Sequence, residues 1–321
     1  MNNYWGSVRF FKHLILLGLA VMIAVPVGTS VGLGVSNYRL REELAASRAT
    51  TATIPPDDAN APADPQVIDP TEPIAVHDQL DTPIADVQED LPYRSLYPEL
   101  YCEGPAAERE TTENTVYLTF DDGPSELTPQ ILDILREKDV KACFFVVGHT
   151  LHTEEGRENL RRIAAEGHTI GIHSSSHNYR KIYASIDAFL EDFNSIYQKV
   201  YEITGVRAEI FRFPGGSLNA YNSTIYQELI AEMTRRGFTY YDWNVSSGDA
   251  TLTNSPSAQR LADTVLSQAG KCQRAIVLMH DSKDKKNTVK ALPDIIDRLR
   301  DEGYAIVPLT REVNPIIFGY R

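Results

Sequence analysis

Thr119-Phe120-Asp121-Asp122-Gly123 is the stretch on which the interpretation of this 321-residue chain depends. Residues 116–120 are β-branched and aromatic and predict a strand, which Gly123 and the proline after it should end. Adjacent residues on a strand point to opposite faces, so both carboxylates can serve one site only if the strand ends there and the backbone turns. We therefore expect Asp121 and Asp122 to meet in one site at a strand end.

A second motif, His173-Ser174-Ser175-Ser176-His177, places two imidazoles four residues apart. This spacing puts both rings on one face of a helical turn. One carboxylate and two histidines make a three-ligand set that suits a catalytic divalent metal ion with open positions for water and substrate. The other aspartate is then left beside the ion as a base. The pattern indicates metal-assisted hydrolysis.

Three further motifs follow along the chain: Arg212-Phe213-Pro214-Gly215-Gly216, the stretch from Trp243 to Asp249, and Leu278-Met279-His280. In this order the five motifs resemble the polysaccharide deacetylases of the NodB-homology type, carbohydrate esterase family 4, over roughly residues 112–312. The resemblance implies an α/β fold, a distorted short (β/α) barrel, and metal-dependent removal of acetyl groups from a polysaccharide.

The resemblance also implies roles for single residues. Asp122, His173 and His177 would hold one divalent metal ion, expected to be Zn²⁺ with Co²⁺, Mn²⁺ or Ni²⁺ as alternatives. Such an ion lowers the pKa of its bound water to about 7. Asp121 would accept the proton of that water as general base.

The other roles fall on the three later motifs. Arg212 would pair with the base and keep it ionised and oriented. His280 would be the general acid that protonates the leaving amine, and Asp249 would orient it. The backbone N–H of Gly215 would stabilise the oxyanion.

Two positions depart from the family's pattern. Gly215 stands where the family often has an aromatic residue, and Ala250 stands where a tryptophan follows the acid. We therefore expect the sugar-binding groove to be more open, or to be filled by another segment. Its predicted wall residues are Trp243, Leu278 and Pro214, and ordinary core packing is the alternative for the first two.

The predicted catalytic domain alternates strands and helices, which implies parallel strands joined by helical crossovers, with the site at the carboxyl ends of the strands. Helix 256–269 should be capped by Ser255 with Pro256 at its first position. The predicted strands are 116–120, 143–147, 169–172, 210–213, 240–244, 275–279 and 305–308. The predicted helices are 127–138, 158–166, 186–204, 225–236, 256–269 and 289–302.

The N-terminus carries an uncharged run of about 22 residues, 14–35, which is long enough to cross a hydrocarbon core of about 30 Å as a helix. Arg9 and Lys12 precede it, so the positive-inside rule places the N-terminus in the cytoplasm. A cleaved signal peptide is the alternative, but the run is long for one and lacks a clean cleavage site. We expect a single-pass protein of the bacterial cell membrane with its catalytic domain outside the cytoplasm, or a secreted protein if the segment is cleaved.

The predicted organisation therefore has four parts. A linker rich in Pro, Ala, Asp and Thr cannot bury enough surface to fold and should be a disordered tether. The parts are a cytoplasmic tail (1–13), the anchor (14–35), the juxtamembrane segment and linker (36–111), and the catalytic domain (112–321).

The net charge bears on the class of binding partner, and the cysteines bear on disulfide bonding. The formal net charge of −13 argues against nucleic-acid binding, and no protein partner is predicted. Cys143 lies in an apolar run and should be a buried free thiol. A disulfide between Cys102 and Cys272 is an expectation compatible with an extracytoplasmic location.

Three function hypotheses follow. The first is an N-acetyl deacetylase of a cell-surface glycan, with peptidoglycan as the natural polymer for an anchored enzyme and its N-acetylglucosamine or N-acetylmuramic acid residues as substrate; chitin oligomers are the alternative. The second uses the same residues on O-acetyl esters of a polysaccharide such as xylan. The third is a membrane-tethered glycan-binding protein without catalysis, which would have no need to keep an acid and a base together.

Overall fold

The structure is a computed structural model that describes residues 91–102, 112–250 and 256–318, all within one compact unit, Ile84–Arg321. The predicted anchor and most of the predicted linker lie outside the described residues. In the part of the chain that is described, no helix has the length and apolar character needed to span a membrane.

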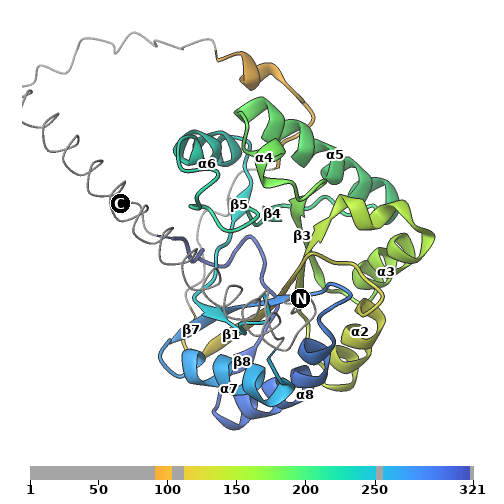
Figure 1. Cartoon of the computed structure of the whole chain (residues 1–321), viewed down its shortest axis with the longest axis vertical. Helices are drawn as coiled ribbons and strands as arrows, with labels where there is room; N and C mark the ends of the chain where they lie inside the picture. Colours follow the sequence, from red (N-terminus) through yellow and green to blue (C-terminus); the bar gives the residue numbers. More distant parts are fainter. Residues whose placement is uncertain (1–90, 103–111, 251–255, 319–321) are drawn as a thin grey trace, which may run out of the picture. The chain divides into compact units, whose positions relative to one another are not determined.

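One parallel sheet of eight strands forms the centre of this unit (Figure 1). Its order is β5-β4-β3-β2-β1-β7-β6, and β8 pairs with β1. No pairing joins the edge strands β5 and β6 within the described residues, so the sheet is an open half-barrel. The strands are β1 (Thr115–Asp121), β2 (Cys143–Val147), β3 (Thr169–Ser174), β4 (Ile210–Phe211), β5 (Thr239–Tyr240), β6 (Val245–Ser246), β7 (Arg274–His280) and β8 (Ala305–Ile306).

Helices connect the strands and surround the sheet (Figure 1). The predicted alternation of strands and helices is confirmed, as parallel strands require such crossovers. The α-helices are α2 (Thr128–Glu137), α3 (Glu154–Ala165), α4 (Tyr179–Ile182), α5 (Ile186–Thr204), α6 (Tyr226–Arg235), α7 (Ala258–Ala269) and α8 (Lys286–Asp301), and the 3-10 helices are η1 (Pro92–Ser95) and η2 (Gly148–His152).

Two local predictions are wrong. The single strand expected at 240–244 is interrupted, because β5 ends at Tyr240 and β6 begins at Val245. The cap of α7 is Ser257, whose hydroxyl accepts from the backbone N–H of Arg260 at 3.3 Å. Pro256 therefore precedes the cap. The expectation that it is the first helical residue, a position that proline often occupies, is wrong.

The two faces of the sheet carry two hydrophobic clusters, as the period of two along a strand requires. Val116, Leu118 and Phe120 belong to the larger cluster, which includes the buried faces of the helices. Tyr117 belongs to the smaller cluster on the inner face, together with Cys143, Phe145, Ile210, Tyr241, Ile276, Leu309 and Val313. Asp121 is four residues after Tyr117, so β1 directs it to the inner face as well.

The segment just before the predicted catalytic domain is part of the folded unit, which corrects the boundary expected at residue 112. Tyr93 and Leu100 are buried, and the Tyr93 hydroxyl donates to Glu228 at 2.7 Å. The fully buried Arg236 guanidinium holds this segment by donating to four backbone carbonyls, those of Tyr93, Leu96, Tyr97 and Leu100. These bonds join residues far apart in sequence, so local composition could not predict them.

The predicted disulfide is absent, because Cys102, Cys143 and Cys272 are all free thiols. Cys102 Sγ lies 3.7 Å from the carbonyl oxygen of Ala208, and Cys272 Sγ lies 3.5 Å from that of Gln268 in α7. The two thiols thus face different backbone carbonyls and not each other. Cys143 is buried in β2, as predicted.

Candidate active site

The two adjacent aspartates reach one site because the backbone turns between them. Asp121 is the last residue of β1, and its side chain is buried. Asp122 has φ of +72°, in the left-handed region, so its side chain leaves the strand's alternation and turns towards the same site. The turn is fixed from β7, since the backbone N–H of Asp281 donates to the Asp121 carbonyl at 2.7 Å.

The two histidines come from a strand end and a loop, not from the helical turn that their spacing indicated. His173 belongs to β3, whereas His177 follows in a loop with φ of +51°. The Asp192 carboxylate on α5 supports the loop by accepting from Ser174 Oγ, Ser175 N and Ser176 N at 2.6, 2.7 and 2.9 Å. Side-chain hydrogen bonds thus set the separation of the rings.

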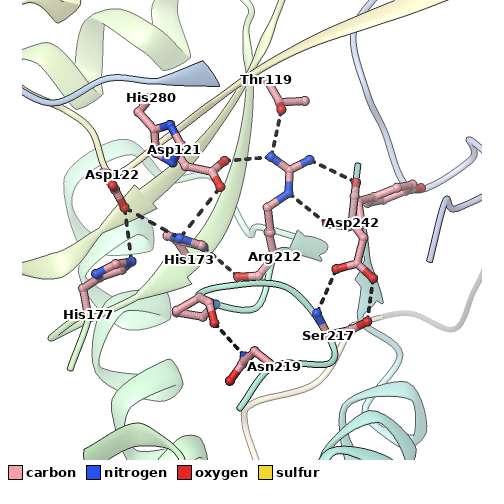
Figure 2. Close-up of polar contacts among 12 residues, drawn as sticks. Thr119, Asp121, Asp122, His173, His177, Arg212, Ser217, Asn219, Asp242 and His280 are labelled. Atoms are coloured by element: carbon pink, nitrogen blue, oxygen red, sulfur yellow. Dashed lines mark hydrogen bonds and ion pairs between the residues drawn. The ribbon is translucent and has the colours of Figure 1, made fainter. Parts of the chain in front are cut away.

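Asp122, His173 and His177 bring three ligand atoms within 4.8 Å of one another (Figure 2). His177 Nε2 and His173 Nε2 lie 3.3 and 3.7 Å from Asp122 Oδ1. That oxygen is buried and has no hydrogen-bond partner among the described residues, which is costly unless a ligand satisfies it. A carboxylate and two imidazoles around an orphaned oxygen fit a divalent metal ion.

His173 is prepared for this role by its surroundings. Its Nδ1 lies 2.8 Å from the Arg212 carbonyl, which can only accept, so Nδ1 carries the proton and the lone pair of Nε2 faces Asp122. Burial lowers the pKa of His173 to about 3, so its ring is neutral at neutral pH, as a metal ligand must be.

Asp121 forms a buried ion pair with Arg212, whose Nη1 donates to Asp121 Oδ1 at 2.8 Å (Figure 2). Arg212 is completely buried and also donates to Thr119 Oγ1 and to the carbonyls of Tyr241 and Asp242. Burial raises the pKa of Asp121, and the guanidinium opposes that rise. A carboxylate with a raised pKa is a better proton acceptor than an exposed one.

Asp249 and His280 form a second pair. His280 Nδ1 lies 2.8 Å from Asp249 Oδ1, so Nε2 is the ring nitrogen left to exchange a proton. Asp249 Oδ2 accepts from the His280 backbone N–H and from Thr288 Oγ1, which fixes the carboxylate. Burial alone would lower the pKa of His280, but the hydrogen bond and charge of Asp249 outweigh it and raise the pKa.

Asp121, His280 and the three-ligand group all line one cavity of about 560 Å³, and Arg212 and Asp249 lie buried behind the first two. Two of the three predicted wall residues, Trp243 and Leu278, line this cavity, and so do Gly215 and Ala250, the two positions that depart from the family's pattern. Pro214 is buried, and its carbonyl accepts from the Tyr183 hydroxyl at 2.8 Å; it is not among the described residues that line the cavity. An adjoining cavity of about 540 Å³ shares Asp122 and His177 with the first and is also lined by His149.

Three supporting acids had no place in the sequence interpretation. Asp192 holds the histidine loop; Asp281 accepts from Ser125 Oγ and Thr128 Oγ1 at 2.8 and 2.6 Å. Asp242 accepts from the N–H and hydroxyl of Ser217. Only Asp192 had a signal in the sequence, since it is an acid on the apolar face of a helix. That face also carries Phe189, Phe193 and Ile196.

Comparisons with known proteins agree with this geometry. Residues 108–236 match the family described as polysaccharide deacetylase. A Bacillus subtilis protein named as a polysaccharide deacetylase, YheN, is 30% identical over 235 residues, covering 73% of this chain and 80% of the relative. The peptidoglycan-N-acetylglucosamine deacetylase of Bacillus cereus is 32% identical over 191 residues, covering 59% of this chain and 66% of the relative.

A solved structure shows the same fold. The catalytic domain of peptidoglycan N-acetylglucosamine deacetylase from Eubacterium rectale is 36% identical and superposes with a TM-score of 0.63. The match covers 67% of this chain and 97% of that domain. By family match, sequence identity and fold, this chain belongs to the polysaccharide deacetylase family.

Proposed function

We propose that this protein removes N-acetyl groups from peptidoglycan, at N-acetylglucosamine or N-acetylmuramic acid residues, with Zn²⁺ as its metal ion. The observation that carries the proposal is the placement of Asp121, paired with Arg212, and of His280, paired with Asp249, on the cavity that the three-ligand group also lines. A proton acceptor and a proton donor on one substrate pocket are what amide hydrolysis requires.

A divalent metal ion held by Asp122, His173 and His177 would polarise a water molecule and the amide carbonyl. Asp121 accepts the proton of the attacking water through Oδ2, the oxygen that Arg212 does not bind. As the C–N bond breaks, His280 Nε2 gives its proton to the nitrogen, so that the products are a free amine on the sugar and acetate. The N–H of Gly215, which lines the cavity, donates to the carbonyl oxygen as negative charge develops there.

Two facts support peptidoglycan as the polymer. The Bacillus cereus relative and the Eubacterium rectale domain are both named for peptidoglycan N-acetylglucosamine. The uncharged run 14–35 is long enough for a membrane anchor, and an enzyme so held, with its catalytic domain outside the cytoplasm, would work next to the cell wall. We therefore place the protein at the bacterial cell membrane.

The test is acetate release by the full-length chain, purified in detergent, from peptidoglycan, chitin oligomers and acetylated xylan. We expect release from peptidoglycan to stop after treatment with a chelator and to return when Zn²⁺ is added. The control is an Asp122→Ala protein prepared in parallel, which should release no acetate at any Zn²⁺ concentration because it lacks a metal ligand.

Other outcomes would replace the proposal. Release from chitin oligomers alone would keep the amide chemistry but change the polymer. Release from xylan alone would make the protein an esterase. No release from any of the three by metal-loaded protein would favour the tethered glycan-binding protein.

A further inference from the structure

Tyr179, the first residue of α4, forms an aromatic wall of the cavity beside the metal-ligand group. Its ring stands edge-on to the His177 ring at 5.3 Å and lies 5.2 Å from the ring of Tyr221. Behind it, Tyr183 packs at 6.2 Å and donates its hydroxyl to the Pro214 carbonyl. The position of Tyr179 is therefore fixed on the side away from the cavity.

Gly215 lies against the Tyr179 ring, where a residue with a side chain would not fit. A Cβ atom at Gly215 would lie 2.8 Å from Tyr179 Cε1 and 3.3 Å from its hydroxyl oxygen, so a side chain there would overlap the ring. The φ of +76° at Gly215 also disfavours any residue with a side chain. The tyrosine thus occupies the space that residue 215 leaves empty.

Tyr221 differs from the other exposed tyrosines of the described part. Tyr101 and Tyr201 each lie under an arginine, at 5.4 Å from Arg235 and 4.5 Å from Arg207. Tyr221 is 51% exposed, and its ring packs against that of Tyr179, a residue that lines the active-site cavity. An aromatic surface left exposed beside a catalytic cavity suits a ligand with an apolar face.

We propose that Tyr179 and Tyr221 form a stacking platform for the pyranose rings of the glycan, an inference that rests on the function proposed above. Tyr179, next to His177, packs against the sugar that carries the acetyl group, and Tyr221, one ring farther out, packs against the following sugar. The C–H face of a pyranose is apolar and its rim carries hydroxyls, which matches a tyrosine's apolar ring and polar tip. The Tyr179 hydroxyl has no hydrogen-bond partner in the described residues, so it is available for a hydrogen bond with a sugar hydroxyl.

The experiment measures KM and kcat of the full-length protein on glycan chains on which the wild type is active. Tyr179→Ala should raise KM for the glycan about tenfold, since an aromatic stacking partner is lost. Its kcat should change less than its KM, because the loss falls on glycan binding. Bound metal, measured by elemental analysis, and the circular dichroism spectrum should match the wild type, which shows that the variant is folded and metal-loaded. Tyr221→Ala should raise the glycan KM less.

Two further variants make the test specific. Tyr179→Phe keeps the ring and should stay close to the wild type in glycan KM. Tyr201→Ala removes an exposed tyrosine on α5 that does not line the cavity, and it should leave the glycan KM unchanged. An unchanged glycan KM in Tyr179→Ala, or an equal rise in Tyr201→Ala, would overturn the platform and leave the proposed function intact.

If the wild type deacetylates no glycan, the proposed function has failed, and binding still decides the platform. Calorimetric titration with chitin oligomers should then show binding by the wild type and weaker binding by Tyr179→Ala. Equal binding by both, or no binding by the wild type, would overturn it.

Discussion

Arg212 holds Asp121 by one carboxylate oxygen and leaves the other directed at His173. The Arg212 Nη1 to Asp121 Oδ1 distance is 2.8 Å, and Asp121 Oδ2 lies 3.8 Å from His173 Nε2. Because the guanidinium is completely buried and also bound to Thr119 and two backbone carbonyls, it cannot follow a displaced carboxylate. The base is thus held in position before substrate arrives.

Asp121→Asn keeps the shape of this side chain and an acceptor for Arg212, but it cannot take a proton. We expect kcat for acetate release to fall by about 10²–10⁴-fold, the usual contribution of a general base. Bound metal, measured by elemental analysis, should stay at the wild-type level because the ligands are Asp122 and the two histidines. Asp284→Asn, at an exposed acid that lines the same cavity, is the control and should retain activity. Wild-type turnover in Asp121→Asn would remove Asp121 from the mechanism.

Arg212→Lys tests whether the fork of the guanidinium positions the base. A lysine is a single flexible ammonium and cannot reproduce the separate bonds to Asp121, Thr119 and the backbone. We expect kcat to fall by about 100-fold, as for a misplaced catalytic group, with little change in KM.

The matched control is Arg236→Lys. Arg236 is also completely buried and is paired with Glu232 at 2.7 Å, but it holds the segment before β1. Both variants should unfold at lower temperature, whereas only Arg212→Lys should lose kcat per folded molecule. An equal loss of kcat in the two variants would mean that Arg212 acts through stability alone.

Asp249→Asn tests the general acid through the pH profile. The pKa of His280 is raised by Asp249, and the acid is active only while protonated, so activity falls as pH rises through that pKa. Without the negative charge the pKa of His280 drops, and the alkaline limb of kcat/KM should move to lower pH. If Asp284→Asn moves the limb equally, the shift reflects the net charge of the cavity and not the Asp249–His280 pair.

The sequence was sufficient to predict the reacting groups, because each of them lies at a strand end inside a short motif. Asp121, His173, Arg212 and His280 follow inner-face positions of their strands, so the alternation of the strands and the carboxyl-edge rule bring them together. The helical turn expected for the two histidines was wrong because a spacing of four also fits a loop, and Asp192 from α5 selects the loop.

What the sequence could not supply depends on contacts between distant segments. The packing of Tyr179 on Gly215 joins α4 to the loop after β4, and no local pattern predicts it. The Arg236 bonds to residues 93–100 likewise cross more than a hundred positions, and so a stretch that the sequence interpretation assigned to the linker is in fact part of the fold. The separation of Cys102 and Cys272 is of the same kind, because pairing requires proximity that spacing does not encode.

His168 should make the stability of the protein depend on pH in the acid range. It is only 6% exposed, its Nδ1 accepts from the Ala142 backbone N–H, and its Nε2 has no partner among the described residues. Burial lowers the pKa of His168 from 6.5 to about 4. Between these values the unfolded chain binds a proton that the folded chain does not. Stability is therefore full above pH 6.5 and declines as the pH falls towards 4.

The measurement is the free energy of unfolding from denaturant titrations between pH 7 and 4. The uptake of one proton on unfolding gives the free energy of unfolding a slope of about 1.4 kcal/mol per pH unit. His168→Asn should remove this contribution to the slope, while the asparagine amide oxygen can still accept from the Ala142 backbone N–H. His152→Asn, at an exposed position in η2, is the control and should leave the wild-type slope, because water surrounds that residue in both states. If His168→Asn also keeps the wild-type slope, proton uptake at other groups causes the acid sensitivity, and His168 has no part in it.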